Sequence, residues 1–413
     1  MEYLERKTCR VDGTPLKTIL DLGNIYPSTF IEDGPYDQEL EKVPLILTRG
    51  EGSNLVQLKH TVNRDFLYRK YWYRSQLNSS MVRSLEDIVT NIRRKTSFFS
   101  DDVIVDIGCN DGTMLALFPT AFKVGVDPAN NLSAVASKNC DLFINDYFDD
   151  RVLGQLPKKA KVITSIAMFY DLEDPNEFVK NVAEMLEPYG IWVIQLTDLL
   201  SMFKINAFDN IVHEHLEYYS LDTLDALLRK YGLCVFDVQY NDVNGGSIRA
   251  YISQSDKWIV NDSVERALKK EAEYMASFDD PFEDFKRRSE KIKKSITIFI
   301  RDMRLAGKSV YGLGASTKGN TLLQYFDLTQ EDVQGIGEIN PDKFGLRTVG
   351  SNIPILPEID VIENITPDYC LVLPWHFIRG ITERCARYLE MGGQLIVPCP
   401  EPRIITRNGS EWI

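Results

Sequence analysis

The sequence predicts a multidomain α/β fold in which a small β-rich domain precedes two units that alternate strands and helices. Short apolar runs alternate with helical patterns from residue 101 to 254, and a second such unit begins near residue 308. At 413 residues and 44% apolar content, the chain is long enough for two or three packed domains. We place the domains at 1–80, 81–255 and 256–413.

The charge balance limits the kinds of partner. The chain carries 47 basic and 60 acidic residues, a formal net charge of -13. This excess of acid disfavours a broad nucleic-acid or anionic-membrane surface, so any phosphate-binding patch must be local. No apolar stretch approaches the roughly 20 residues that span a bilayer, and the N-terminus lacks the apolar core of a signal peptide. We expect a cytoplasmic monomer or homodimer that binds neither nucleic acid nor membranes.

The cysteines indicate free thiols. There are seven, an odd number, and they form no close pairs in the sequence. This spacing fits neither a disulfide framework nor a cysteine-rich metal site. Free thiols are typical of a reducing compartment.

The N-terminal region combines short strands with an aromatic segment. Strand candidates at Leu16–Leu22 and Leu55–Leu58 are separated by glycine, proline and aspartate turns. The segment Lys70–Asn78 is rich in aromatic, basic and amide side chains, and a helical pattern capped by Ser79 or Ser80 follows it. The aromatic segment is equally consistent with a lid over a ligand and with packing between domains.

The first alternating unit begins with a strand, a glycine turn and a helix start. The apolar run Val103–Ile107 suits a strand buried on both faces of a parallel sheet, and Gly108 and Gly112 bracket the turn after it. Glycine lets a ligand lie against the backbone, where helix N-terminal amides face it. About twenty residues on, Asp127 ends the next strand, where Rossmann-like sheets hold ribose hydroxyls. The spacing predicts an adenosine-type ligand.

Later strand ends add polar groups to the same edge. The remaining apolar runs are 122–126, 142–145, 161–166, 191–196 and 233–238. The third strand ends at Asp146 and Tyr147, where an acid can contact adenine, and the fourth leads to Asp171. Because ligands collect at the carboxyl edge of a doubly wound sheet, these residues should lie beside the ligand.

The segment Asn210–Ser220 contains two of the four histidines, His213 and His215, on either side of Glu214. Histidine titrates near neutrality and suits proton transfer. The metalloprotease motif places its histidines four residues apart on one helix face, whereas these differ by two, so we do not expect a zinc site here. Taken alone, the segment is also consistent with histidines that only satisfy hydrogen bonds in the core.

Two more glycine turns are candidate sites. Asn244–Arg249 is consistent with a plain hairpin or with a loop whose arginine forks onto a ligand or a carboxylate. Charged helical patterns from 256 to 304 are typical of solvated helix faces. The turn Gly312–Gly319 loosely matches a dinucleotide fingerprint, with Glu338 near the place of a ribose acid. Because the turn carries Lys318, a diphosphate fits at least as well, and a turn that only packs strand against helix is the third possibility.

The motifs, taken in order, are specific as a set although each is modest alone. They are Tyr71–Asn78, Asp106–Gly112, Gly125–Ala129, His213–His215, Gly245–Arg249, Tyr311–Gly319, Asn340–Lys343, Ile353–Ile355 and Val397–Pro400. Over nearly the whole chain they resemble the C-methyltransferases that use S-adenosyl-L-methionine (SAM) to act on nucleotide-linked deoxysugars. The resemblance implies a Rossmann-like class I SAM methyltransferase domain and a second Rossmann-like domain for the nucleotide sugar, with the reaction between them.

The resemblance also implies roles for individual residues. SAM, which leaves as S-adenosylhomocysteine (SAH), would contact Asp106, Gly108, Asn110, Gly112, Asp127, Pro128, Asp146 and Tyr147. The nucleotide sugar would contact Tyr71, Arg74, Asn78, Ser247, Arg249, Ser316, Lys318, Asn340, Lys343, Trp375 and His376.

The implied reaction is an enolate alkylation without a metal. A ketone acidifies the neighbouring carbon, a base removes the proton, and the enolate carbon takes the methyl group. By similarity to the family's Glu-His pair, His215 is the base and Glu214 assists it, with Tyr73 and Asp171 as further catalytic candidates.

Two departures from the family pattern leave the substrate open. Asp171 stands where relatives often have histidine, and Val212 where they usually have tyrosine. An O-methyltransferase acting on a nucleotide sugar or related glycan precursor is the second hypothesis, and an NAD-dependent sugar oxidoreductase using residues 312–319 is the third. A nucleotide-sugar-binding protein without activity is the fourth.

The first domain lacks most of the zinc ligands found in the family it resembles. Relatives usually have Cys-Arg-x-Cys and Cys-x-x-Cys turns there, whereas this chain keeps Cys9 and has Asp12, Gly50 and Ser53 at the other positions. One thiolate cannot build a four-ligand zinc site.

We therefore predict that the purified protein carries no stoichiometric zinc. Elemental analysis of protein dialysed without a chelator measures this directly. One tightly bound equivalent of zinc would contradict the prediction.

Overall fold

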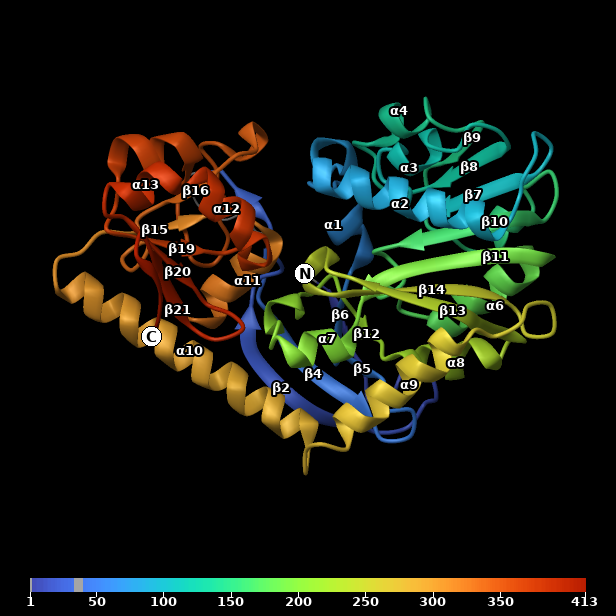
Figure 1. The fold of residues 1–413 in the computed structure, drawn as a ribbon, viewed down its shortest axis with the longest axis horizontal. Helices are drawn as coiled ribbons and strands as arrows, with labels where there is room; N and C mark the ends of the chain where they lie inside the picture. The colour runs from blue at the N-terminus through green and yellow to red at the C-terminus, as the bar shows by residue number, and fades with distance from the viewer. Residues whose placement is uncertain (1, 33–39) are drawn as a thin grey trace.

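The computed structural model describes residues 2–32 and 40–413, and it consists of two α/β lobes held together by N-terminal strands. In Figure 1 the C-terminal lobe lies on the left and the central lobe on the right, with the blue strands of the N-terminal part between and below them. Within the described residues, no helix is both long enough and apolar enough to cross a membrane.

The N-terminal part is an antiparallel sheet that binds both lobes through main-chain pairing. The sheet order is β12-β5-β4-β2, with β2 (Leu16–Ile25), β4 (Val43–Gly50), β5 (Val56–Leu58) and β12 (Glu217–Tyr218). Two ribbons are separate from it: β1 (Tyr3–Glu5) with β6 (His60–Val62), and β3 (Phe30–Ile31) with β17 (Arg347–Thr348). Strand β12 comes from the central region and β17 from the C-terminal lobe, so this part contacts both.

The four positions that carry zinc ligands in the resembled family lie close together. Cys9 Sγ is 3.3 Å from Ser53 Oγ, and a Cβ atom on Gly50 would be 2.9 Å from that sulfur. Asp12 accepts a 2.8 Å hydrogen bond from the Thr14 hydroxyl. In residues 2–32 and 40–413 no group of three or more His, Cys, Asp or Glu side chains is placed to hold a metal ion.

The central sheet has the predicted doubly wound topology. Its order is β13-β14-β11-β10-β7-β8-β9, and only β14 runs antiparallel to its neighbours. The strands are β7 (Val103–Ile107), β8 (Phe122–Val126), β9 (Leu142–Ile144), β10 (Ala160–Ile166), β11 (Leu186–Thr197), β13 (Leu233–Asn241) and β14 (Ser247–Gln254). The helices of this lobe are α3 (Thr113–Ala116), α4 (Ser133–Ala136), α5 (Asp150–Leu153), α6 (Pro175–Met185) and α8 (Leu221–Arg229). The six predicted strands are all present.

The aromatic segment leads from α1 (Arg64–Tyr68) and the short turn η1 (Ser75–Leu77) into α2 (Ser79–Lys95). The predicted cap at Ser79 or Ser80 is wrong, because Asn78 Oδ1 accepts from the main-chain amides of Ser80 and Met81, at 3.1 and 3.3 Å. A carboxamide oxygen one residue earlier reaches two of the amides in the first turn that have no intrahelical partner. The apolar face of α2 packs on the central sheet.

The C-terminal lobe is a second α/β sheet. Its order is β18-β16-β15-β19-β20-β21-β22, parallel up to β20 and antiparallel beyond it. The strands are β15 (Val310–Leu313), β16 (Ile336–Glu338), β18 (Ile355–Pro357), β19 (Tyr369–Val372), β20 (Gln394–Val397), β21 (Arg403–Thr406) and β22 (Gly409–Trp412). The helical elements are α11 (Thr317–Tyr325), η4 (Pro341–Lys343), η5 (Asp360–Ile365), η6 (Trp375–Phe377), α12 (Ile378–Arg384) and α13 (Ala386–Glu390).

Two charged helices connect the lobes, as predicted from residues 256 to 304. They are α9 (Asp262–Met275) and the 25-residue α10 (Pro281–Leu305), which at 1.5 Å per residue is about 37 Å long. In Figure 1, α10 runs along the underside of the molecule from the N-terminal sheet to the C-terminal lobe. Its buried face includes Phe285, Ile292, Ile296 and Ile300, and most of its charged side chains are on the other faces.

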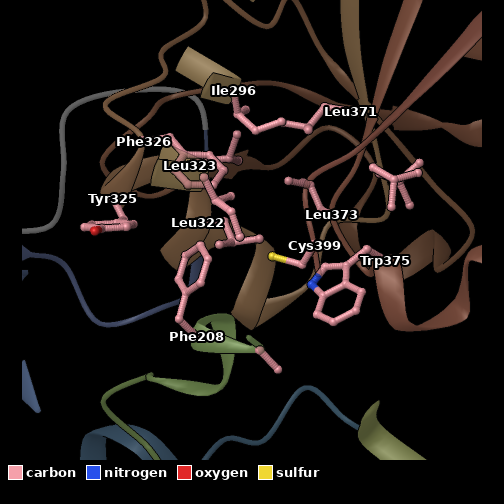
Figure 2. Close-up of a cluster of buried hydrophobic side chains, with 14 of the residues drawn as sticks. Phe208, Ile296, Leu322, Leu323, Tyr325, Phe326, Leu371, Leu373, Trp375 and Cys399 are labelled. Carbon is pink, nitrogen blue, oxygen red and sulfur yellow. The ribbon is translucent and has the colours of Figure 1, made fainter. Parts of the chain in front are cut away.

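The chain between β11 and α8 leaves the central sheet and packs into the core of the other two parts. It contains α7 (Leu199–Lys204) and the turn η2 (Phe208–Asn210), whose apolar side chains share one core with the N-terminal sheet, α10 and α11. Phe203 stacks on Phe285 at 4.7 Å between ring centroids. Figure 2 shows Phe208 rising from this segment into the C-terminal cluster, beside Tyr325 and Phe326. We call residues 199–218 the base segment, because they include His215, the predicted base.

A buried ion pair fixes the end of the base segment. Arg10 Nε is 3.7 Å from Glu217 Oε1, and both side chains are fully buried. The same guanidinium donates to the main-chain oxygen of Leu58 at 2.7 Å. The Glu217 amide donates to the Tyr170 carbonyl at 2.9 Å, so this pair connects the N-terminal sheet to the end of β10.

Arg10→Met should lower the free energy of unfolding by about 3 kcal/mol, because it removes the buried guanidinium that faces Glu217 and donates to the Leu58 carbonyl. Urea denaturation measures the change. The double variant Arg10→Met/Glu217→Gln should regain part of the loss, since no unpaired charge remains. An unchanged midpoint for Arg10→Met would contradict a role for this pair.

Candidate active site

A cavity of about 2770 Å³ lies where the N-terminal part, the carboxyl edges of both large sheets and the base segment meet. Nearly all the residues predicted for the two ligands and the chemistry line it. The exceptions are Gly112, Ser247, Arg249 and Trp375. The fold thus brings groups more than a hundred residues apart in the sequence to one place, as expected for strand ends at a sheet edge.

The four exceptions support the walls of the cavity. Gly112 adopts a φ of +75° and precedes α3, behind the first turn. Ser247 donates to the Val243 carbonyl at 2.8 Å and closes the β13–β14 hairpin. Arg249, on β14, points along the sheet and donates to Gln195 at 2.9 Å and Asp87 at 2.8 Å. Neither residue lines the cavity, and the substrate contacts expected of Ser247 and Arg249 stay predictions.

The first ligand turn is formed by the end of β7. Gly108 has a φ of +75°, and a Cβ atom there would lie 2.8 Å from Met168 Cγ, so only glycine fits. Asp106, just before it, accepts from the Thr164 hydroxyl at 2.8 Å, and burial raises the pKa of Asp106 to about 7. These contacts leave an open main-chain turn beside a buried carboxyl at the cavity wall.

Asp127 lies at the end of β8, opposite that turn. Its carboxylate accepts from the main-chain amides of Asn110 at 2.8 Å and Ala129 at 2.9 Å, which fix its orientation. Burial raises the pKa of Asp127 to about 6. The missing Cβ atom of Gly108 leaves room for a ligand at the turn. The oriented carboxylates beside it suit a ligand that carries a positive charge and ribose hydroxyls, and SAM is such a ligand.

The aromatic segment is bound to the first ligand turn. The Asn110 side chain donates to the Tyr73 carbonyl and accepts from the Ser75 amide, both at 3.0 Å. The Tyr71 amide donates to Asn131 at 2.9 Å. The carboxamide of Asn110 thus orders the segment that places Tyr71, Tyr73, Arg74 and Asn78 at the cavity.

His215 is held in one tautomer by the base segment. Its Nδ1 is 3.0 Å from the main-chain oxygen of Asn210, and because a carbonyl only accepts, Nδ1 carries the proton. The other nitrogen, Nε2, is therefore an acceptor, and the residue lines the cavity. Burial, with a further contribution from the positive charge of Lys318, lowers the pKa of His215 to about 3. His213 differs, because it is buried against the Val43 carbonyl at 3.2 Å.

Two acids near His215 have raised pKa values. Burial raises the pKa of Glu214 to about 7. Burial, together with the carboxyls of Glu214 and Glu217, raises the pKa of Asp171 well above its ordinary value. Asp171 Oδ1 and Glu214 Oε2 are buried and have no hydrogen-bond partner among the described residues. A protonated carboxyl in this position can donate to a ligand oxygen.

The second ligand turn follows β15. Ser316 caps α11 by accepting from the Gly319 amide at 3.0 Å. Lys343 donates to the Ala315 carbonyl at 2.7 Å and lies 3.8 Å from Glu338. Lys318 donates to the Asn210 side chain. Burial lowers the pKa of both lysines, which shows how little water surrounds these ammonium groups.

Sequence reasoning missed Asp209, which joins the base segment to the C-terminal lobe. Its Oδ2 accepts from Trp375 Nε1 at 3.1 Å and His376 Nε2 at 3.0 Å. Trp375 therefore makes an interdomain contact, and its expected substrate contact stays a prediction. Burial would raise the pKa of Asp209, but His376, Lys318 and Trp375 together hold it below its ordinary value. A Cβ atom on Gly245 would overlap the His376 ring, so glycine at this position leaves room for the His376 side chain where the two lobes meet.

The chain is similar to known methyltransferases along most of its length. Family models described as a methyltransferase domain and a C-methyltransferase C-terminal domain match residues 73–238 and 242–400. The C-methyltransferase NovU of Streptomyces niveus is 31% identical over 362 residues, 86% of this chain and 86% of NovU. The chain belongs to this C-methyltransferase family. It is a SAM-dependent methyltransferase, and its central domain is the class I SAM methyltransferase fold.

Two more distant proteins are similar to part of this chain. The mitochondrial ubiquinone biosynthesis O-methyltransferase of Schizosaccharomyces pombe is 25% identical over 171 residues, 37% of this chain and 62% of that protein. Magnesium protoporphyrin IX methyltransferase (ChlM) from Synechocystis PCC 6803 with bound SAH matches 45% of this chain and 91% of its own, at 13% identity and a TM-score of 0.35.

Asp127→Asn should weaken SAM binding at neutral pH by about tenfold or more, because an amide replaces the carboxylate that accepts hydroxyl hydrogen bonds. In the wild type, affinity should fall as the pH drops below about 6, the pKa of Asp127, because the carboxylate is the binding form. Calorimetric titrations across pH measure both effects. If the SAM affinity of Asp127→Asn fell with decreasing pH as steeply as that of the wild type, this role of Asp127 would be contradicted.

Proposed function

We propose that this enzyme transfers the methyl group of SAM to a carbon of a nucleotide-diphosphate-linked keto-deoxysugar, with His215 as the base. The observation that carries the proposal is the position of His215, whose Nε2 is free to accept a proton at a cavity that the glycine turn of the central sheet and the lysine turn of the C-terminal sheet both line. Carbon methylation agrees with the family.

The charges around the second turn support a diphosphate. The protein as a whole is acidic, yet Lys318 and Lys343 both line the cavity with their amines largely buried. Burying an ammonium group is costly unless an anion compensates it. A diphosphate provides that compensation with two negative groups, and the α11 start adds main-chain amides.

The proposed reaction begins with proton removal at the carbon next to the ketone. Nε2 of His215 accepts the proton, and the electron pair of the broken C–H bond moves onto the ketone oxygen. The protonated Asp171 carboxyl can donate to that oxygen, which stabilises the enolate. SAM, when bound, supplies an electrophilic methyl group on a positively charged sulfur. His215 returns its proton to solvent afterwards.

Product analysis tests the function. The protein is incubated with a panel of nucleoside-diphosphate keto-deoxysugars and SAM labelled with ¹³C in the methyl group, and the product is examined by NMR. We expect the label at a carbon-bound methyl group. A label found only on oxygen would overturn the proposal, as would the absence of turnover across the panel.

His215→Gln should reduce methyl transfer by about 100-fold or more while leaving SAM affinity unchanged, because a glutamine amide cannot accept the proton. In D₂O with SAH in place of SAM, the wild type should exchange the substrate hydrogen next to the ketone and His215→Gln should not. His213→Gln is the matched control, since His213 is buried away from the cavity. Full exchange in His215→Gln would identify another base.

A further inference from the structure

The base of this enzyme is connected to the second ligand turn through a single residue. The main-chain oxygen of Asn210 accepts from His215 Nδ1 at 3.0 Å and from the Tyr218 hydroxyl at 3.1 Å. Its side-chain oxygen accepts from Lys318 Nζ. Asn210 is almost fully buried, and its amide nitrogen has no partner among the described residues. One asparagine therefore contacts both the proton acceptor and the cation of the other turn.

The separation of these groups is fixed by packing. Phe208 anchors η2 in the C-terminal cluster, with ring centroids 5.7 Å from Tyr325 and 6.1 Å from Phe326 of the α11 region (Figure 2). Asp209 is held by Trp375 and His376 from the opposite side. Lys318 lies on the first turn of α11. The ammonium group therefore stays close to the imidazole in the ligand-free protein.

In that state His215 is a weak base. Burial lowers its pKa to about 3, and the charge of Lys318 is the next cause. A histidine with so low a pKa is a poor acceptor for a proton from carbon, because this proton transfer becomes more favourable as the pKa of the base approaches neutrality. The other titratable groups near His215 are Asp209 on η2, Glu214 beside it, Asp171 and Tyr170 after β10, Tyr218 on β12 and Tyr68 on α1.

We propose that Lys318 and Asn210 couple the two ligand sites, so that a diphosphate binding to Lys318 turns His215 into a competent base. The inference rests on the proposed function, since it takes the second turn as the diphosphate site. Two negative groups next to Lys318 offset its charge, and in a poorly hydrated cavity a charge acts over several ångströms with little screening. The ammonium group of Lys318 then repels the imidazolium formed by proton transfer less strongly. Asn210 is the positioning residue, because it fixes both the tautomer and the distance.

The test measures the charge of His215 directly. Full-length protein labelled with ¹⁵N and ¹³C in its histidine rings is titrated by NMR, and the His215 signal is assigned by its absence in His215→Gln. Lys318→Met and Lys318→Gln should each raise the pKa of His215 by about one pH unit or more without any ligand, which is a tenfold rise in the imidazolium fraction at about pH 5. Lys343→Met is the matched control, because Lys343 lines the same cavity but bonds Ala315 and should leave His215 unchanged.

The second arm adds inorganic pyrophosphate to the wild type, with binding followed by calorimetry. Bound pyrophosphate should also raise the pKa of His215, as the Lys318 variants should. Pyrophosphate that binds without this rise, or that does not bind, would overturn the coupling, and so would an unchanged His215 in both Lys318 variants. Because no sugar and no SAM are present, these outcomes are separate from the product analysis that judges the proposed function.

Discussion

Burial of the base segment in a core shared by the N-terminal sheet and the C-terminal lobe is the constraint on which the site depends. Phe203 and Phe208 leave the central domain and pack against α10 and α11. Each such ring contributes about 1.5–3 kcal/mol when fully buried. His215 therefore belongs to the methyltransferase domain in the sequence, but the N-terminal sheet and the C-terminal lobe hold it in place.

The charged groups of the cavity follow a consistent arrangement. Two carboxyls with raised pKa values, Asp171 and Glu214, lie beside the proposed base, whereas the amines of Lys318 and Lys343 lie at the second turn. Several of these groups are buried with orphan atoms, which costs stability in the free protein. The guanidinium groups of Arg10 and Arg249 each donate to several acceptors, although Arg10 Nε has no hydrogen-bond partner among the described residues.

Much of the fold was predictable, because alternating apolar runs and glycine turns are local signals. The end of β7 with Gly108 and the acid Asp127 fall where the pattern placed them. The two-residue strand β12 was not predictable, since its pairing with β5 joins residues about 160 positions apart and involves no periodic pattern. An arginine after a glycine pair has the same sequence whether it binds a substrate or neighbouring strands, so the contacts of Arg249 with Gln195 and Asp87 were not predictable. The NovU comparison confirmed the resemblance to C-methyltransferases, while the individual roles of the site residues stay predictions.

The course of residues 199–218 has a consequence for engineering. A hybrid enzyme that takes its C-terminal lobe from a relative would place a foreign α11 and a foreign tryptophan against this chain's Phe208 and Asp209. The mismatch would fall on the hydrogen bonds that orient the base as well as on interdomain packing. The natural unit of exchange is therefore discontinuous, and it comprises the lobe together with the insertion that it anchors.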